Sequence, residues 1–185
     1  MALLTIREIF DLVVMTGALG YIFMSYVRQP GMFAAREGFD WNAFWFAMGL
    51  TAPGIVFHEL SHKFVALAFG MIATFHASYF GLALGLFLKM VNSPFVIFAP
   101  GFVEMGGGMT VLGTTVSAFA GPAMNLLLFF IAKLVLARKR RVTQRQFVVW
   151  HLTKQVNLFL FLFNMIPLPP FDGAKVFSGL LQLLF

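Results

Sequence analysis

The stretch at residues 41–69, WNAFWFAMGLTAPGIVFHELSHKFVALAF, decides the predicted fold. It is apolar and long enough to cross a bilayer as a helix, and two tryptophans open it, as aromatic residues do at a membrane interface. Pro53-Gly54 interrupts the run, and we expect a kink there. Near its end the run carries His58, Glu59 and His62. Ionisable side chains are costly in such a segment, so they indicate a functional site.

The pentad HELSH at 58–62 predicts a metal site. On a helix, positions i and i+4 share one face, so both imidazoles can reach one ion, and Glu59 beside them can take a proton from water. Catalytic zinc takes three protein ligands and keeps one open position. The chain has no Cys, so the third ligand should be His, Asp or Glu at membrane depth. We favour Asp172, which follows an apolar run and a proline break. Glu104, the competitor, lies beside a glycine turn and is more simply interpreted as solvent-exposed.

Composition indicates a membrane protein. The chain has 185 residues, of which 60% are hydrophobic and 11% charged, whereas a soluble domain has about 25% charged residues. The formal net charge is +6. Part of it forms a cluster that suits lipid headgroups: Arg138, Lys139, Arg140, Arg141 and Arg145. Nothing around this cluster is arranged to contact bases, so we expect a lipid bilayer and no nucleic acid as partner.

Four apolar runs predict transmembrane helices. They lie at about 9–27, 41–69, 110–137 and 147–165. Glu8 and Asp11 come early and no small-residue cleavage site follows them, so we expect the first run to be retained. Three prolines, Pro167, Pro169 and Pro170, end the fourth run, and the final apolar segment is too short to span comfortably.

Residues 71–110 allow two interpretations. They are apolar but are interrupted by several prolines and glycines, including Gly106-Gly107-Gly108. One more helix across 79–99 fits this pattern, and two or more short strands dipping into the membrane fit it as well. Non-helical backbone at that depth survives only where protein or a water-filled cavity covers it.

Three motifs resemble those of the site-2 protease family of intramembrane zinc metalloproteases, of the archaeal and bacterial type. They are HELSH at 58–62, GPAMN at 121–125, which looks like GPxxN, and NMIPLPPFDG at 164–173, which looks like NxxPxPxxDG. They occur in the family's order. We therefore expect a single transmembrane metalloprotease domain over 1–185, with its core at about 45–175 and an additional N-terminal helix and loop over 1–40.

The resemblance implies an all-α polytopic membrane protein with about 4–5 transmembrane helices. A membrane-embedded β-hairpin or sheet segment would lie between the second and third helices. His58, His62 and Asp172 would bind one Zn²⁺ ion, and Glu59 would be the general base. The substrate would be a transmembrane protein, cleaved within or near its membrane segment, and the chain would be a multi-pass integral protein of the cell membrane.

Two asparagines complete the implied site. By resemblance, Asn164 would contact the substrate or the developing oxyanion, and Asn125 would line the site. From the residues alone, Asn125 fits equally well as a hydrogen-bonding group between helices. Asn157 shares a helix face with Asn164, seven residues later. Asn164 is the better candidate because the proline break follows it at once.

The alternative function is a catalytically silent membrane protein that binds metal, either a zinc carrier or a scaffold. Glu59 argues against it, since a carrier needs no general base beside its ion. A carrier should also show paired repeats, and the sequence has none. Two predictions of orientation disagree. If residues 71–110 do not cross the membrane, loops 28–41 and 138–145 share a side and the positive-inside rule places them in the cytoplasm, whereas the family pattern implies the reverse. If 71–110 crosses once, the charge count on each side changes.

Overall fold

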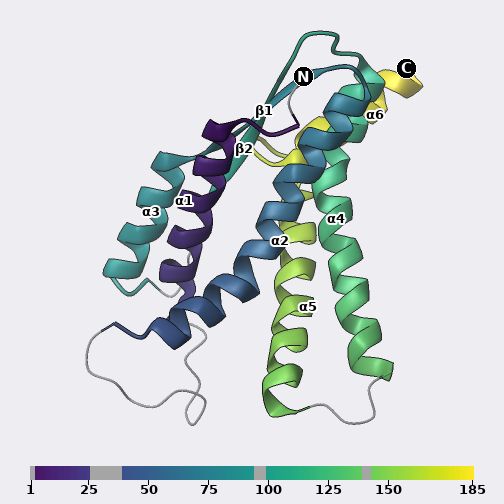
Figure 1. Ribbon diagram of the computed structural model, residues 1–185. Coiled ribbons are helices and arrows are strands. Elements are labelled where there is room, and N and C mark those ends of the chain that lie inside the picture. Colours follow the sequence, from purple (N-terminus) through teal and green to yellow (C-terminus); the bar gives the residue numbers. More distant parts are fainter. Residues whose placement is uncertain (1–2, 26–38, 94–98, 139–142) are drawn as a thin grey trace. The chain divides into compact units, whose positions relative to one another are not determined.

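The computed structural model describes residues 3–25, 39–93, 99–138 and 143–185 (Figure 1). Helices dominate these ranges, and one occupies each of the four apolar runs. The elements in chain order are α1 (Ile6–Phe23), α2 (Trp41–Ala68), β1 (Ile72–Ala77), α3 (Tyr79–Met90), β2 (Gly101–Gly106), α4 (Val111–Arg138), α5 (Gln144–Asn164) and α6 (Asp172–Leu184).

The segment at 71–110 contains both structures that its sequence allows. β1 and β2 pair in a two-stranded sheet, and the 12-residue helix α3 joins them. The pairing is antiparallel, because the Ser78 N–H donates to the Pro100 carbonyl at one end while Gly107 lies against Ile72 at the other. Of the two forms that the family resemblance implies, a sheet is observed and a short-turned hairpin is not.

The described chain divides into two compact units, one formed by residues 1–53 and 75–102, the other by 54–74 and 103–185. Their boundaries fall inside α2, β1 and β2. In the first unit, α1 packs against α3. Met15, Leu19 and Ile22 of α1 are fully buried, as expected for one face of an amphipathic helix.

Two acidic side chains of α1 bind the strand β1. Glu8 and Asp11 are only 1% and 2% exposed. Glu8 Oε1 accepts the N–H of Phe75 at 2.7 Å, and Asp11 Oδ2 accepts the N–H of Ala77 at 3.2 Å. Asp11 Oδ1 also accepts the Tyr79 hydroxyl at 2.6 Å. Since alternate N–H groups of a strand point to opposite edges, these carboxylates occupy the edge of β1 that does not pair with β2.

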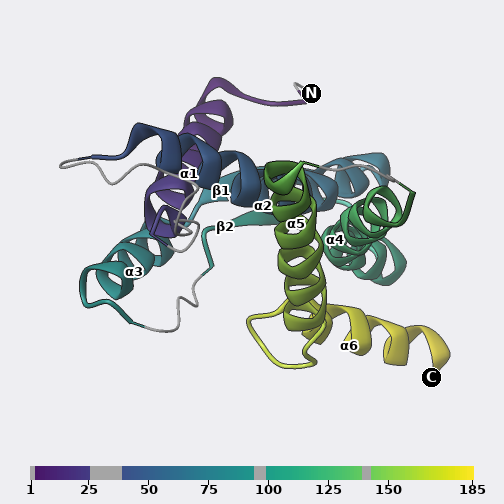
Figure 2. The same ribbon diagram turned by 90° about the horizontal axis from the view of Figure 1, so that it is seen from below.

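In the second unit, α4 packs against both α5 and α6 (Figures 1 and 2). Close approach of α6 depends on Gly179, because a Cβ atom there would overlap the Thr115 side chain of α4. A small cluster of Ala66, Met71 and Ala73 lies at the junction of α2 and β1. This unit contains all the predicted site residues.

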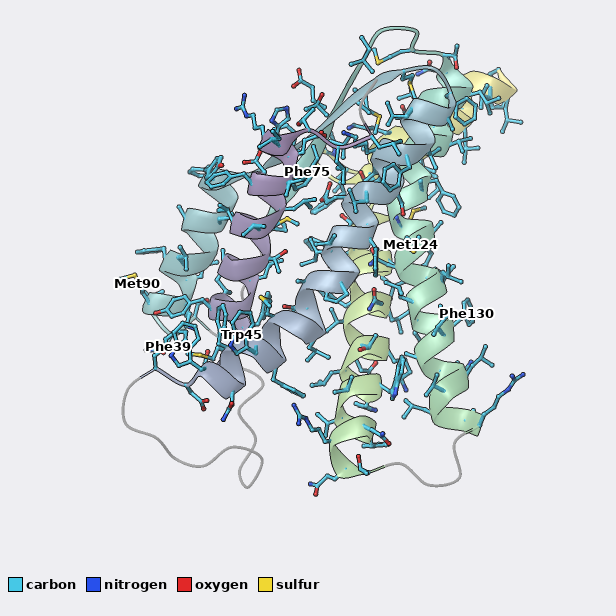
Figure 3. All side chains as sticks on the ribbon, viewed as in Figure 1. Phe39, Trp45, Phe75, Met90, Met124 and Phe130 are labelled. Carbon is cyan, nitrogen blue, oxygen red and sulfur yellow. The ribbon has the colours of Figure 1, made fainter. Side chains whose placement is uncertain are left out.

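The outer surface of α4 is apolar. Four large side chains spaced at i, i+3, i+4 and i+7 are exposed, and Figure 3 shows one of them, Phe130, on the side away from α5. They are Leu127, Phe130, Ile131 and Leu134. Within the described ranges, α4 is the one helix long and apolar enough to cross a membrane by length and composition. The expectation of four to five transmembrane helices stays a prediction.

Candidate metal centre

The two histidines of the HELSH pentad lie on successive turns of α2 and face each other. Their Nε2 atoms are 3.0 Å apart, and the two rings are nearly perpendicular, with centroids separated by 4.7 Å. Both side chains are buried. The i, i+4 spacing therefore brings two imidazole nitrogens to one point, as the helical interpretation of the pentad requires.

Asp172 joins the two histidines from the first turn of α6. Its Oδ2 atom is 3.2 Å from Nε2 of His58 and 3.2 Å from Nε2 of His62. In the part of the chain that the structure describes, these three residues form the one group of His, Asp or Glu close enough to share an ion. Glu104, the other candidate for third ligand, is exposed on β2 and lies outside this group.

The position of Asp172 depends on how the chain turns between α5 and α6. A Cβ atom at Gly173 would lie 2.5 Å from the carbonyl oxygens of Met165 and Ile166. Only glycine fits this close backbone approach. The turn that contains the three prolines therefore folds the first residues of α6 back onto the end of α5, which holds Asp172 in place.

Gly121 of α4 makes room for both imidazoles. A Cβ atom there would lie 2.6 Å from Cε1 of His62 and 2.8 Å from Cε1 of His58. Any larger residue would displace the rings. This glycine of the GPAMN motif therefore accommodates the two histidines.

The proton position on His62 follows from its main-chain partner. Nδ1 of His62 is 2.7 Å from the carbonyl oxygen of Ser117 in α4. A carbonyl oxygen can only accept, so Nδ1 carries the hydrogen and donates it. The Nε2 atom of neutral His62 then has a lone pair directed at Asp172.

The same holds for His58, through Asn125. Nδ1 of His58 lies 2.6 Å from Oδ1 of Asn125. The orientation of that amide is determined by its other end, where Nδ2 donates to the carbonyl oxygen of Gly54 at 3.0 Å. Oδ1 therefore faces the histidine and accepts its proton. Both Nε2 atoms are acceptors.

These atoms fit a zinc ion. Two imidazole nitrogens and a carboxylate oxygen converge at 3.0–3.2 Å. When both rings are neutral, no hydrogen lies among these three atoms, an arrangement that a cation would stabilise. Tetrahedral zinc, with bonds of about 2.0–2.1 Å, places its ligand atoms about 3.3–3.4 Å apart. Mg²⁺ and Ca²⁺ prefer all-oxygen sites. Two histidines and one acid leave the fourth position open, as catalytic zinc sites do.

Glu59 is buried next to His58 in α2. Its carboxyl group interacts electrostatically with His58, Asp172 and Lys175. Among the residues that the structure describes, none forms a hydrogen bond with this carboxylate. Its oxygens can therefore accept a hydrogen bond from a water molecule, which is what the role of general base requires.

The structure separates the two predicted asparagines. Asn125 contacts His58 directly, and both of its N–H groups are engaged, one with Gly54 and one with Oδ1 of Asn157 at 2.9 Å. Asn164 donates to the Leu160 carbonyl of its own helix and, among the described residues, forms no hydrogen bond with a member of the metal group. Its predicted contact with substrate stays a prediction. Asn157, the less favoured of the two asparagines on α5, is the one that reaches the site.

Curated proteins similar to this chain carry names that agree with the site. "Putative zinc metalloprotease MJ0611" of Methanocaldococcus jannaschii is 36% identical over 174 residues, which cover 92% of this chain and 83% of the relative. "Putative zinc metalloprotease sll0528" of Synechocystis sp. is 30% identical over 164 residues, 88% of this chain and 38% of the relative. "Putative zinc metalloprotease YwhC" of Bacillus subtilis is 35% identical over 74 residues, 34% of this chain and 32% of the relative.

No protein-family profile matches the chain. No solved structure matches it either. The archaeal relative nonetheless aligns along most of both chains, and the group of His58, His62 and Asp172 has the donor atoms that zinc takes. This chain therefore belongs to the zinc metalloprotease family that these relatives represent.

Proposed function

We propose that this chain is an intramembrane zinc metalloprotease of the site-2 protease type, which hydrolyses peptide bonds within or near transmembrane segments of membrane-anchored proteins. One observation carries the proposal: three acceptor atoms of His58, His62 and Asp172 converge beside the buried Glu59. Family membership supports the metalloprotease chemistry. The exposed apolar side chains of α4 support a lipid environment, since water is a poor solvent for such a surface.

Each residue of the site has a distinct task in this reaction. His58, His62 and Asp172 would hold the ion, which when bound would polarise the scissile carbonyl and make water a better nucleophile. Glu59 accepts a proton as the oxygen of water bonds to the carbonyl carbon. It then delivers that proton to the amide nitrogen as the C–N bond breaks, so the products are a carboxylic acid and an amine.

A transmembrane substrate must be locally unwound before it is cut, because a helix engages its carbonyl groups in hydrogen bonds. An unwound stretch needs new partners, and a free strand edge supplies them by strand addition. Glu8 and Asp11 already occupy the outer edge of β1. We therefore assign the outer edge of β2 to the substrate.

The test of the proposed function is the substitution Glu59→Gln. Glutamine keeps the size and shape of glutamate but cannot take up the proton of water at neutral pH. Purified protein in detergent should retain its zinc, measured by elemental analysis, while cleavage of a transmembrane reporter substrate falls to background. A silent carrier or scaffold predicts no difference between the variant and the unaltered protein. Continued cleavage by Glu59→Gln would overturn the assignment.

A further inference from the structure

We propose that Asn157 is a positioning residue that acts through Asn125 to orient the His58 ring for metal binding. The inference rests on the metal-binding role that the proposed function gives to His58. It concerns two asparagines that lie outside the metal group of His58, His62 and Asp172 and that come from different helices, α5 and α4. Together they form a chain of hydrogen bonds that ends on the ligand.

The chain of hydrogen bonds crosses three helices of the second unit. Asn157 Oδ1 accepts from Asn125 Nδ2 at 2.9 Å, and Asn125 Oδ1 accepts from His58 Nδ1 at 2.6 Å. Asn125 is 0% exposed and Asn157 is 1% exposed. Water therefore cannot replace either partner, and the geometry of each amide is transmitted to the next group.

The direction of every hydrogen bond is determined by main-chain carbonyl groups. Asn157 Nδ2 donates to the Thr153 carbonyl at 2.8 Å, which turns Oδ1 of Asn157 toward Asn125. Asn125 must then present its NH₂ group to Asn157 and to Gly54, and its oxygen to His58. Because that oxygen only accepts, the hydrogen of His58 stays on Nδ1 and Nε2 is left to bind a cation.

The packing at Gly54 supports a specific role for Asn157. A Cβ atom at Gly54 would lie 3.0 Å from Oδ1 of Asn157, so the absence of a side chain on α2 lets the amide of α5 reach this depth. Without Oδ1 of Asn157, one buried N–H of Asn125 would have no acceptor. The amide would then rotate to regain a partner, and the His58 ring would follow it.

Partners of this kind matter because they determine which atom of a histidine faces the metal. Groups that hydrogen-bond the non-ligating nitrogen of a ligand histidine change metal affinity by about 10–100-fold when they are removed. An asparagine pair between helices with only a packing role would not have this effect. Zinc affinity therefore separates the two roles of Asn157.

The experiment compares Asn157→Asp with Asn157→Leu in the purified full chain. Aspartate keeps an oxygen acceptor facing Asn125 but, when ionised, loses the donor to Thr153, whereas leucine of similar size loses both. Competition with a chelator should show zinc affinity near that of the unaltered protein for Asn157→Asp, and about 10–100-fold weaker for Asn157→Leu. With Co²⁺ in place of zinc, the visible absorption bands should shift in Asn157→Leu only.

Asn164 offers a matched control on the same helix. Its Nδ2 donates to the Leu160 carbonyl at 3.0 Å, in the same i−4 pattern as Asn157, but among the described residues it forms no hydrogen bond with Asn125 or with a histidine. Asn164→Asp and Asn164→Leu should leave zinc affinity and the Co²⁺ spectrum unchanged. Should Asn157→Leu fail to fold, Asn157→Ala serves as the second variant, with the same expected loss of affinity.

The possible outcomes are distinct. Equal weakening in Asn157→Asp and Asn157→Leu would reduce Asn157 to a packing role and overturn the proposal, as would unchanged affinity in Asn157→Leu. Neither result would affect the proposed function, because the unaltered protein would still bind zinc. Absence of zinc binding by the unaltered protein would overturn the proposed function and the positioning role together.

Discussion

Two pairs of acidic side chains in this protein have opposite surroundings. In the first unit, the oxygens of Glu8 and Asp11 meet donors: main-chain N–H groups of β1 and the Tyr79 hydroxyl. In the second unit, Asp172 meets two histidine nitrogens that are themselves acceptors when the rings are neutral, and no hydrogen bond reaches Glu59 among the described residues.

The difference distinguishes acids that stabilise the fold from acids that belong to a reactive site. A buried acid matched by N–H and O–H donors is stabilised by the protein itself and needs nothing further. An acid that faces the acceptor nitrogens of neutral imidazoles is stabilised by a cation between them. Glu8, Asp11 and Glu59 are all buried, so burial alone does not mark a functional site; the partners decide which acids belong to one.

The largest expected effect comes from Asp172→Ala. Removal of one of three ligands leaves two histidines, a poor site for zinc in an open cavity. We expect loss of bound zinc and cleavage at background, with partial rescue by excess zinc. Elemental analysis and the reporter assay measure both. Stoichiometric zinc in this variant would show that Asp172 is not a ligand. The difference in hydrogen-bond partners between the two pairs of acids would then not mark a metal site.

Asn164→Ala tests whether the Asn164 amide, like the Glu59 carboxylate, takes part in the reaction. One N–H of Asn164 is used by Leu160, and the second has no partner among the described residues. If it donates to the developing oxyanion, cleavage should slow by about 10²–10³-fold while zinc stays bound. Steady-state cleavage rates decide the matter, and an unchanged rate would return Asn164 to a packing role.

Gly121→Ala tests whether metal binding and cleavage require the observed positions of the His58 and His62 rings. The added methyl group would overlap both imidazole rings, and a displacement of about 1 Å at a reactive site can cost about 10²-fold in activity. We expect a loss of that size in cleavage, with weaker zinc binding in a chelator titration. Gly49→Ala in α2 is the control, because a Cβ atom there meets nothing within 4 Å. Equal cleavage rates and equal zinc binding in the two variants would show that a side chain at position 121 does not displace the imidazole rings.

The smallest functional effect is expected from Asp11→Ala, because Asp11 belongs to the pair of acids whose oxygens accept hydrogen bonds from the protein itself. Loss of this acceptor leaves the buried Ala77 N–H unpaired and removes the hydrogen bond of the more exposed Tyr79 hydroxyl, which should lower the free energy of unfolding by about 1–3 kcal/mol. Zinc content should not change. Denaturant titration in detergent measures the first quantity and elemental analysis the second. Tyr79→Phe removes only one of the two hydrogen bonds and should destabilise less.

The convergence of the metal group was predictable because its determinants are local. The helical spacing of His58 and His62 and the proline break before Asp172 are visible as patterns, although Asp172 lies 114 residues after His58. The partners on Nδ1 were not predictable. One is the carbonyl of Ser117, a main-chain atom that every residue has.

The role of Asn157 and the structure of residues 71–110 could not be predicted either, because both depend on contacts between distant parts of the chain. Asn157 and Asn164 share a face of α5, and only the packing of α4 decides which amide meets Asn125. The strand β1 owes two of its N–H partners to α1, 66 and 67 residues earlier in the chain. A local pattern contains neither fact, which is why helix and strand stayed equally acceptable for 71–110.

The pairing of α1 with β1 has a consequence for biosynthesis. Glu8 leaves the ribosome 67 residues before the Phe75 N–H that it accepts, and at about 5–20 residues per second this interval lasts about 3–13 s. During that time both carboxylates lack their final donors, and apolar surroundings would penalise them. We therefore expect the start of α1 to remain in contact with water until β1 emerges, so that α1 reaches its final position only after β1 has been made.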